Sequence, residues 1–170
     1  MSSKIGWLNA MPPDQAEAEL LTCCASKRWA RKVATGRPYV DGATLIAAAV
    51  SGVRELGWPD VAKALDGHPR IGERGKAGLS QRETSWSRDE QSGAATADTA
   101  VLDALHDGNV AYENQFGHVF LIRATGRTAE EMLAELTRRL SNSVEDERIV
   151  VQAELAEITR LRVRKLLEDR

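Results

Sequence analysis

Cysteine is scarce in this sequence. The only two copies, Cys23 and Cys24, are adjacent. A disulfide between neighbouring residues would be strained and would close almost no loop, so it would add little stability. No third or fourth ligand stands at the spacing of a zinc site, which argues against a metal pair. We expect both side chains to be reduced thiols that pack in the interior.

An excess of charge of one sign is also missing. The formal net charge is -2, from 23 Lys and Arg against 25 Asp and Glu, and both signs are mixed along the chain. A protein that binds a phosphate backbone needs a basic face, which this pattern does not predict. We therefore expect no nucleic-acid partner.

Long apolar runs are absent as well. The stretch 1–15 lacks the apolar run of a signal peptide, and no later segment reaches the apolar length that spans a bilayer. The sequence predicts a soluble, cytoplasmic protein with no membrane partner.

Strand signals are few, and helix signals fill the rest of the chain. Only HVFLIR, at 118–123, combines apolar and β-branched residues, and no second segment is available to pair with it. Ser26 and Asp41 stand at helix N-caps, and Thr128 with Glu131 forms a capping box. Helices are expected at 14–24, 27–35, 42–56, 59–67, 96–117 and 129–140, and from Ser143 almost to the C-terminus, with a long loop at 72–86.

The length of 170 residues suits one domain with a proper core and is too short for two comfortable ones. No internal repeat or linker divides the chain. We expect an all-α, single-domain bundle of about eight helices that covers residues 1–170.

The last expected helix carries a charge within its apolar stripe. At about 100° per residue, Val151, Leu155, Ile158 and Leu166 fall on one face, and Arg162 lies in the middle of that face. Its guanidinium stays charged at any ordinary pH and needs an anion or a set of carbonyl acceptors. The partner is either an acidic side chain of the protein, as is usual for a lone buried arginine, or a ligand that enters a pocket.

The helix expected at 96–117 repeats this anomaly with an amide. Leu102, Leu105, Tyr112 and Phe116 share a face with Asn109, which lies near the helix centre. An asparagine in such a place commonly satisfies the backbone groups of a broken turn. We expect a structural role for Asn109 rather than contact with a substrate.

A third polar segment is SWSRDEQSG, at 85–93. Ser87 and Glu90 stand at the spacing of a capping box, which predicts that a helix starts here. The N-terminus of a helix points unsatisfied N–H groups outward, so the same segment could also bind a carbonyl or an anion. Capping and binding do not exclude each other.

His68 is the sharpest candidate for chemistry among only three histidines. Pro69 stiffens the segment GHPRIGE behind it, and Gly67 and Gly72 allow tight turns. Such a loop would fix the imidazole without burying it. A histidine chosen at random is more often a plain surface residue, but imidazole is also the side chain best matched to proton transfer near neutral pH.

The other two histidines carry weaker signals. His106 lies beside an Asp on an expected helix, where a solvated position is typical, and His118 adjoins the apolar VFLI run. Neither His68 with Glu73 nor His106 with His118 has the one-turn spacing of a helical metal pair. The sequence predicts no metal site.

Seven segments, taken in order, resemble one known family. The 2-oxo-4-hydroxy-4-carboxy-5-ureidoimidazoline (OHCU) decarboxylases of urate breakdown share a His-Pro turn, a Ser-x-x-Glu-Gln segment, an Asn-x-x-Tyr to Phe-Gly run and a terminal Leu-Arg. The likeness covers nearly the whole chain. The matching segments are LLTCCASKRWA, RPY, HPRIGE, SWSRDEQSG, GNVAYENQFGHVFLI, GRTAEEMLAELTRRL and LAEITRLRVRKLL.

The resemblance implies an all-helical homodimer that needs no cofactor and converts a small ureidoimidazoline into (S)-allantoin and carbon dioxide. It implies that His68 is the catalytic histidine, that Glu90 acts beside it, and that Arg162 binds substrate. One departure is His118, where many relatives carry an apolar aromatic. The remaining substrate-binding residues that the resemblance implies are Pro69, Ser87, Arg88, Asp89, Gln91 and the backbone of Phe120, Leu121, Ile122, Arg123 and Ala124.

Two other functions compete with this expectation. A helical interaction module without chemistry would use the apolar helix at 42–56 and the charged C-terminus as docking surfaces, but it would leave the placement of His68, Glu90 and Arg162 unexplained. A cofactor-free hydrolase or isomerase that acts on another ureide would use the same kinds of residue.

Overall fold

The computed structural model describes residues 4–73 and 80–169, which form two compact units. The first unit comprises residues 4–64 and 155–169, and the second comprises the described residues between 65 and 154. The helix α9 (Val144–Glu168) belongs to both units, because residues 144–154 lie in the second and the remainder in the first. One domain over residues 1–170 stays a prediction.

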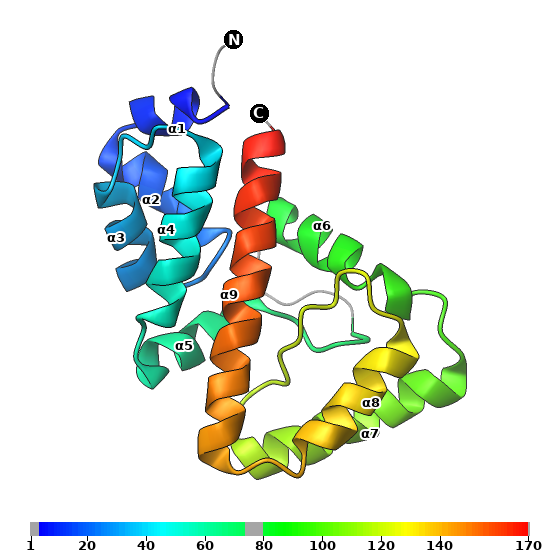
Figure 1. The fold of residues 1–170 in the computed structure, drawn as a ribbon. Helices are drawn as coiled ribbons and strands as arrows, with labels where there is room; N and C mark the ends of the chain where they lie inside the picture. The colour runs from blue at the N-terminus through cyan, green and yellow to red at the C-terminus, as the bar shows by residue number, and fades with distance from the viewer. Residues whose placement is uncertain (1–3, 74–79, 170) are drawn as a thin grey trace. The chain divides into compact units, whose positions relative to one another are not determined.

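Five helices build the N-terminal part of the first unit (Figure 1). Ser26 and Asp41 cap their helices as expected, since their side chains accept hydrogen bonds from the amides of Trp29 and Thr44. The indole nitrogen of Trp29 donates to the carbonyl oxygen of Ala49 at 2.9 Å, which joins two of these helices. The five are α1 (Gly6–Ala10), α2 (Pro13–Leu21), α3 (Lys27–Thr35), α4 (Gly42–Arg54) and α5 (Trp58–Ala64).

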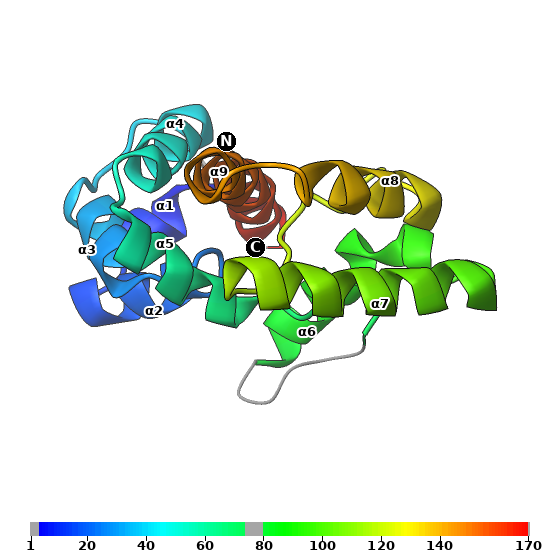
Figure 2. The same cartoon turned by 90° about the horizontal axis from the view of Figure 1, so that it is seen from below.

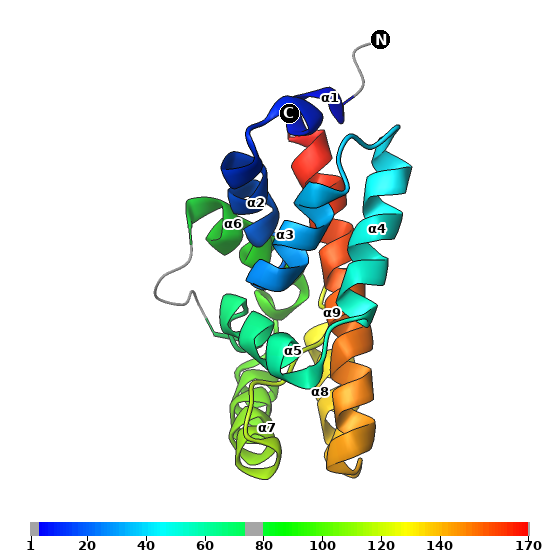
Figure 3. The same cartoon turned by 90° about the vertical axis from the view of Figure 1, so that its left-hand side faces the viewer.

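Within this unit, α3 packs against both α2 and α4 (Figure 3). The helix α1 has no counterpart among the expected elements, because its five residues are too few to show a helical period. Cys23 and Cys24, which follow the end of α2, are buried and form no disulfide among the described residues, which confirms the expectation for both.

The second unit begins with a 3-10 turn and contains three complete α-helices. Of these, α7 and α8 run side by side (Figure 2), and Gly108 of α7 allows the approach, because a Cβ there would lie 2.9 Å from the Leu136 side chain of α8. The elements are the 3-10 turn Leu65–Gly67, α6 (Gln81–Glu90), the 3-10 turn Ser92–Ala94, α7 (Thr99–Phe116) and α8 (Ala129–Arg139).

The start of α6 differs from the expectation. Ser80 and Glu83 form its capping box, whereas Ser87 and Glu90 lie in its last turn. The Ser-x-x-Glu spacing occurs twice in this stretch, and a helix begun at Ser87 would meet Gly93 within two turns. The expected loop at 72–86 is therefore helical from residue 81, and its residues 74–79 lie outside the described part.

The described residues contain nine α-helices and no strand, so the expected all-α class is confirmed. The segment 118–124 is irregular, in agreement with its lack of a pairing partner. Within residues 4–73 and 80–169, no helix has the length and hydropathy needed to cross a membrane.

Candidate active site

The loop that carries His68 follows the short 3-10 turn in the second unit. The amide of His68 donates to the carbonyl oxygen of Leu65 at 3.0 Å, which closes that turn. Both His68 and Pro69 are buried, and only 6% of His68 is exposed. The expectation of an unburied imidazole was wrong, because apolar residues on both sides of the loop, Leu65 and Ile71, draw it into the core.

Two side chains hold the backbone of this loop. The buried Asn109 of α7 donates from Nδ2 to the carbonyl oxygen of Ile71 at 3.0 Å. Gln91 accepts from the amide of Gly72 at 2.9 Å, and Gly72 has a φ of 88°, where glycine is favoured. The structural role expected for Asn109 is confirmed, and Gln91 contributes its side chain to the same task.

A surface ion pair adds a third attachment. Arg70 donates from Nε and Nη2 to the two carboxylate oxygens of Glu113 on α7, at 2.8 and 2.9 Å. This bidentate contact, together with Glu73, raises the pKa of the Arg70 guanidinium. The side chain of Arg70 is about half exposed, so the pair orients the loop more than it stabilises the fold.

The last turn of α6 presents two of the expected site residues to the interior. Ser87 and Glu90 are buried, three residues apart on one face, whereas Arg88 and Asp89 face solvent. The expected contacts of Arg88 and Asp89 with substrate stay a prediction.

The segment Phe120–Ala124 is buried although it forms neither helix nor strand. All its residues except Arg123 are at most 5% exposed. Glu154 accepts a hydrogen bond from the amide of Arg123 at 2.9 Å, and the Nε of Arg127 donates to the carbonyl oxygen of Arg123 at 2.9 Å. Side chains thus replace the regular backbone pairing that the segment lacks.

Ile122 is one of two residues in this segment, with Phe120, whose backbone N–H and carbonyl both lack a hydrogen bond among the described residues. It is 2% exposed, yet no hydrogen bond between the described residues uses its amide N–H or its carbonyl oxygen. Buried backbone groups almost always have partners, since an unpaired one costs as much as a lost hydrogen bond. A ligand that brings an acceptor and a donor would satisfy both groups.

Residues in or next to the three segments expected to form the site contribute to one hydrophobic core. Ile71 comes from the His68 loop, Ala94 from the turn after α6, and Ile122 from the buried segment. Gly93, next to Ala94, allows the backbone of Arg127 to approach closely, because a Cβ at residue 93 would lie only 2.1 Å from the carbonyl oxygen of Arg127. Residues that follow His68 and α6 in the chain therefore share one core with the segment 120–124, and the convergence of the site side chains themselves stays a prediction.

Arg162 belongs to the first unit, where it is almost completely buried in α9. Its apolar stripe is as expected, since Val151, Leu155 and Ile158 are buried too. Burial raises the pKa of the nearby Cys24 thiol to about 12, and the hydroxyl of Thr159 and the charge of Arg162 oppose that rise only in part.

The remaining two histidines are more exposed than His68. The side chain of His106 is 65% exposed and lies near Glu73, as expected for a solvated position. The ring of His118 is half-buried, meets the edge of Tyr112 and lies 3.0 Å from the carbonyl oxygen of Val119. Among the described residues, no group of three or more His, Cys, Asp and Glu side chains could hold a metal ion.

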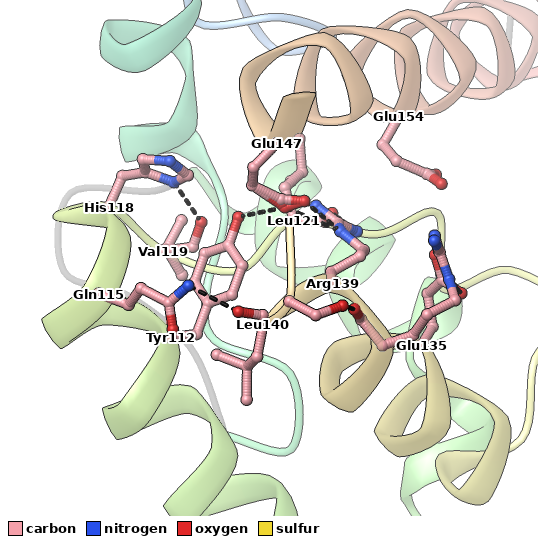
Figure 4. A network of polar contacts seen from close by, with 12 residues as sticks. Tyr112, Gln115, His118, Val119, Leu121, Glu135, Arg139, Leu140, Glu147 and Glu154 are labelled. Atoms are coloured by element: carbon pink, nitrogen blue, oxygen red, sulfur yellow. Dashed lines mark hydrogen bonds and ion pairs between the residues drawn. The ribbon is translucent and has the colours of Figure 1, made fainter. Parts of the chain in front are cut away.

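A buried ion pair in the second unit was not expected from the sequence. Arg139 of α8 and Glu147 of α9 point toward each other, and the hydroxyl of Tyr112 reaches the same carboxylate (Figure 4). A signal was available, because Arg139 continues the buried stripe of Met132 and Leu136 at helical spacing. It is the same anomaly that singled out Arg162.

Comparison with known proteins shows which family and which curated protein the chain is similar to. The model of the OHCU decarboxylase family matches residues 9–164. The uric acid degradation bifunctional protein TTL of Arabidopsis thaliana is 32% identical over 161 residues, which make up 94% of this chain and 50% of that protein. The chain thus spans about half the length of this curated relative.

Two solved structures have the same fold. One is a crystal structure of OHCU decarboxylase in the presence of (S)-allantoin, with a TM-score of 0.76, 32% identity and coverage of 89% of this chain and 98% of that one. The other is a crystal structure of (S)-allantoin synthase, with a TM-score of 0.68 and 18% identity, which covers 95% of this chain and 53% of that one. The second likeness concerns the fold alone.

Proposed function

Because the chain belongs to the OHCU decarboxylase family, we propose that it converts OHCU into (S)-allantoin and carbon dioxide without a cofactor. The family assignment confirms the resemblance found in the sequence. The reaction belongs to urate breakdown, and its substrate is a small, polar ring that carries a carboxylate and a ureido group.

A decarboxylation needs an acceptor for the electron pair of the broken C–C bond, and many enzymes use pyridoxal or thiamine cofactors for this purpose. OHCU has an acceptor of its own, because the carbon that bears the carboxylate is attached to a ring C=N carbon. When carbon dioxide leaves, the electron pair moves into this system and the ring nitrogen takes a proton. The resulting enol-like intermediate becomes allantoin when its ureido-bearing carbon is protonated on one face and its enol hydroxyl gives up a proton to become the ring carbonyl.

The protein then has to orient the ring, place charges and deliver a proton. We assign the proton transfers to His68. Glu90 is assigned a hydrogen bond, either with the ureido group of the substrate or with the imidazole of His68. Arg162 is assigned, on the family resemblance, to an anionic or carbonyl oxygen of the substrate, which its fork of N–H donors suits. Pro69 and the segment Ser87–Gln91 are the remaining proposed contacts.

One observation supports the binding part of the proposal most directly. Ile122 is buried, and the described chain makes no hydrogen bond to its backbone N–H or carbonyl oxygen. An imidazolone ring and a ureido group offer both C=O acceptors and N–H donors, which complement these two backbone groups. The His68 loop lies on the same hydrophobic core as this segment, through Ile71.

The test uses OHCU formed freshly from urate, because the compound is unstable. We expect the purified protein, without added metal, to accelerate both the release of carbon dioxide and the growth of the optical rotation of allantoin over a protein-free control. An interaction module would change neither signal. An enzyme for another ureide would leave OHCU to decay at the uncatalysed rate, and either result would reject the proposal.

We also propose that the protein is cytoplasmic, as the sequence predicts, and that it is a homodimer, as the family resemblance implies. Large apolar side chains on the surface, such as Val40 in the first unit and Ile149 in the second, are compatible with subunit contacts. Light scattering coupled to size exclusion should give twice the mass of one 18.6 kDa chain. A mass of one chain at micromolar concentration would reject the dimer.

A further inference from the structure

We propose that Arg139 and Glu154 are positioning residues that aim the backbone N–H and carbonyl groups of Ile122 at the substrate ring. This inference rests on the proposed function, because it concerns how the segment Phe120–Ala124 binds OHCU. Neither residue belongs to the site segments that the family resemblance implies.

Arg139 holds the segment at two adjacent residues. Its Nη1 donates to the carbonyl oxygen of Leu121 at 2.8 Å, and its guanidinium carbon lies 4.5 Å from the centre of the Phe120 ring. The guanidinium is itself fixed, because Nε donates to the carboxylate of Glu147 at 2.7 and 3.1 Å (Figure 4). Both side chains of this ion pair are completely buried.

Glu147 is held in turn by α7. The Tyr112 hydroxyl donates to its Oε2 at 3.0 Å. Burial, and next the nearby Glu147 carboxylate, raise the pKa of the Tyr112 phenol, so it stays protonated and remains a donor. Three helices thus contribute one side chain each to a rigid support for the Leu121 carbonyl.

The geometry of the peptide bond transmits this support to Ile122. The carbonyl of Leu121 and the N–H of Ile122 belong to one planar trans peptide, so they point in opposite directions. Arg139 therefore fixes the direction of the Ile122 N–H. In the same way, Glu154 binds the amide of Arg123 at 2.9 Å and fixes the Ile122 carbonyl, which lies across the next peptide.

The opposite charges of Arg139 and Glu154 also suit a role in substrate binding. A cation on the Leu121 oxygen polarises that peptide and makes the Ile122 N–H a stronger donor, and an anion on the Arg123 N–H makes the Ile122 carbonyl a stronger acceptor. The ion pair is a poor device for stability alone, since apolar residues often replace buried ion pairs without loss. The Nη2 of Arg139 is buried and has no hydrogen bond among the described residues.

The decisive variant replaces the buried pair by apolar residues, as Arg139→Met with Glu147→Leu. The matched control applies the same changes to a neighbouring surface pair, as Arg138→Met with Glu135→Leu, because Arg138 and Glu135 are ion-paired on the same helix and Arg138 is exposed. Wild-type turnover of OHCU is measured first. If the wild type is inactive, the proposed function fails, and the inference falls with it.

For an active wild type, we expect the buried-pair variant to retain its helical circular dichroism and cooperative unfolding. Its kcat/KM should fall about a hundredfold, as is typical when a reacting group is misplaced by about 1 Å. Its affinity for (S)-allantoin should fall as well, while the surface-pair control stays within about twofold of wild type. A folded buried-pair variant with wild-type kcat/KM would overturn the role of Arg139.

A second set of variants keeps the inference testable if the buried-pair variant does not fold. Glu154→Leu removes the acceptor for the Arg123 amide, and Glu154→Gln keeps an oxygen at that place. We expect Glu154→Leu to raise KM and the Kd of (S)-allantoin about tenfold, close to the worth of one hydrogen bond, and Glu154→Gln to restore both. Equal constants for the wild type and Glu154→Leu would overturn the inference.

Discussion

The side-chain nitrogen of Asn109 lies 3.0 Å from the carbonyl oxygen of Ile71, and this hydrogen bond ties the middle of α7 to the loop that carries His68. Both residues are buried. This amide in an apolar helix face, together with Gln91 and the Arg70–Glu113 pair, therefore holds the distant loop that carries the imidazole.

Replacing Asn109 by Leu should weaken both the fold and the activity. The Ile71 carbonyl would be left buried and unpaired, which costs about 1–3 kcal/mol, and the loop would lose one of its attachments. Urea denaturation measures the first effect and kcat/KM the second. The control is Asn114→Leu, at an exposed position of the same helix. Equal stabilities of the two variants would contradict the structural role of Asn109.

His68→Gln should lower kcat by about a hundredfold to ten-thousandfold, which is the usual contribution of a general acid or base. The variant keeps a polar side chain of similar size, so its circular dichroism spectrum should match that of the wild type. His106→Gln is the matched control, because the side chain of His106 is 65% exposed. Near-normal turnover by a folded His68→Gln protein would remove His68 from the mechanism.

Arg162→Met distinguishes between the two partners that the sequence left open for this guanidinium, an acidic side chain of the protein and a ligand. If Arg162 binds substrate, the affinity for (S)-allantoin should fall at least about tenfold, in keeping with a hydrogen bond from a charged donor. The apolar replacement should leave the melting temperature unchanged or higher, because it removes a buried charge from α9. Loss of stability with normal affinity would identify an internal ion pair instead.

The Cys24 thiol should make the first unit sensitive to alkali. Its pKa is raised from 9.0 to about 12, mainly by burial, so the folded state keeps the thiol neutral. The contribution of this thiol to the free energy of unfolding is complete below pH 9. It is lost between pH 9 and 12, by about 1.4 kcal/mol per pH unit, because the thiol of the unfolded chain ionises first. Urea denaturation from pH 7 to 11 should show a steeper decline for the wild type than for Cys24→Ala. Parallel curves would contradict the shift.

Local signals in the sequence predicted the helices well. Ser26, Asp41 and Thr128 cap their helices at the expected residues, because a cap is a contact between near neighbours and the sequence contains both partners. The start of α6 was misplaced for a local reason too. Two Ser-x-x-Glu patterns lie seven residues apart, and the pattern alone does not rank Ser80 against Ser87.

The contacts that shape the candidate site depend on distant segments, and the sequence predicted fewer of them. The polar residues at apolar positions were visible in the helical period, which identified Asn109 and Arg162 and would have identified Arg139. Their partners were not visible, since Arg139 meets Leu121 and Glu147 only after α8 and α9 have packed. The burial of His68 likewise follows from where Ile71 enters the core.

The unpaired backbone of Ile122 also bears on how long the protein survives. If the substrate ring binds these groups as proposed, an empty site leaves a donor and an acceptor dehydrated at a cost that the bound ring removes, and occupancy should protect the chain from local opening and from proteases. We expect cells rich in the ureide to hold more of this protein at the same rate of synthesis, which would couple enzyme abundance to purine flux without any regulator.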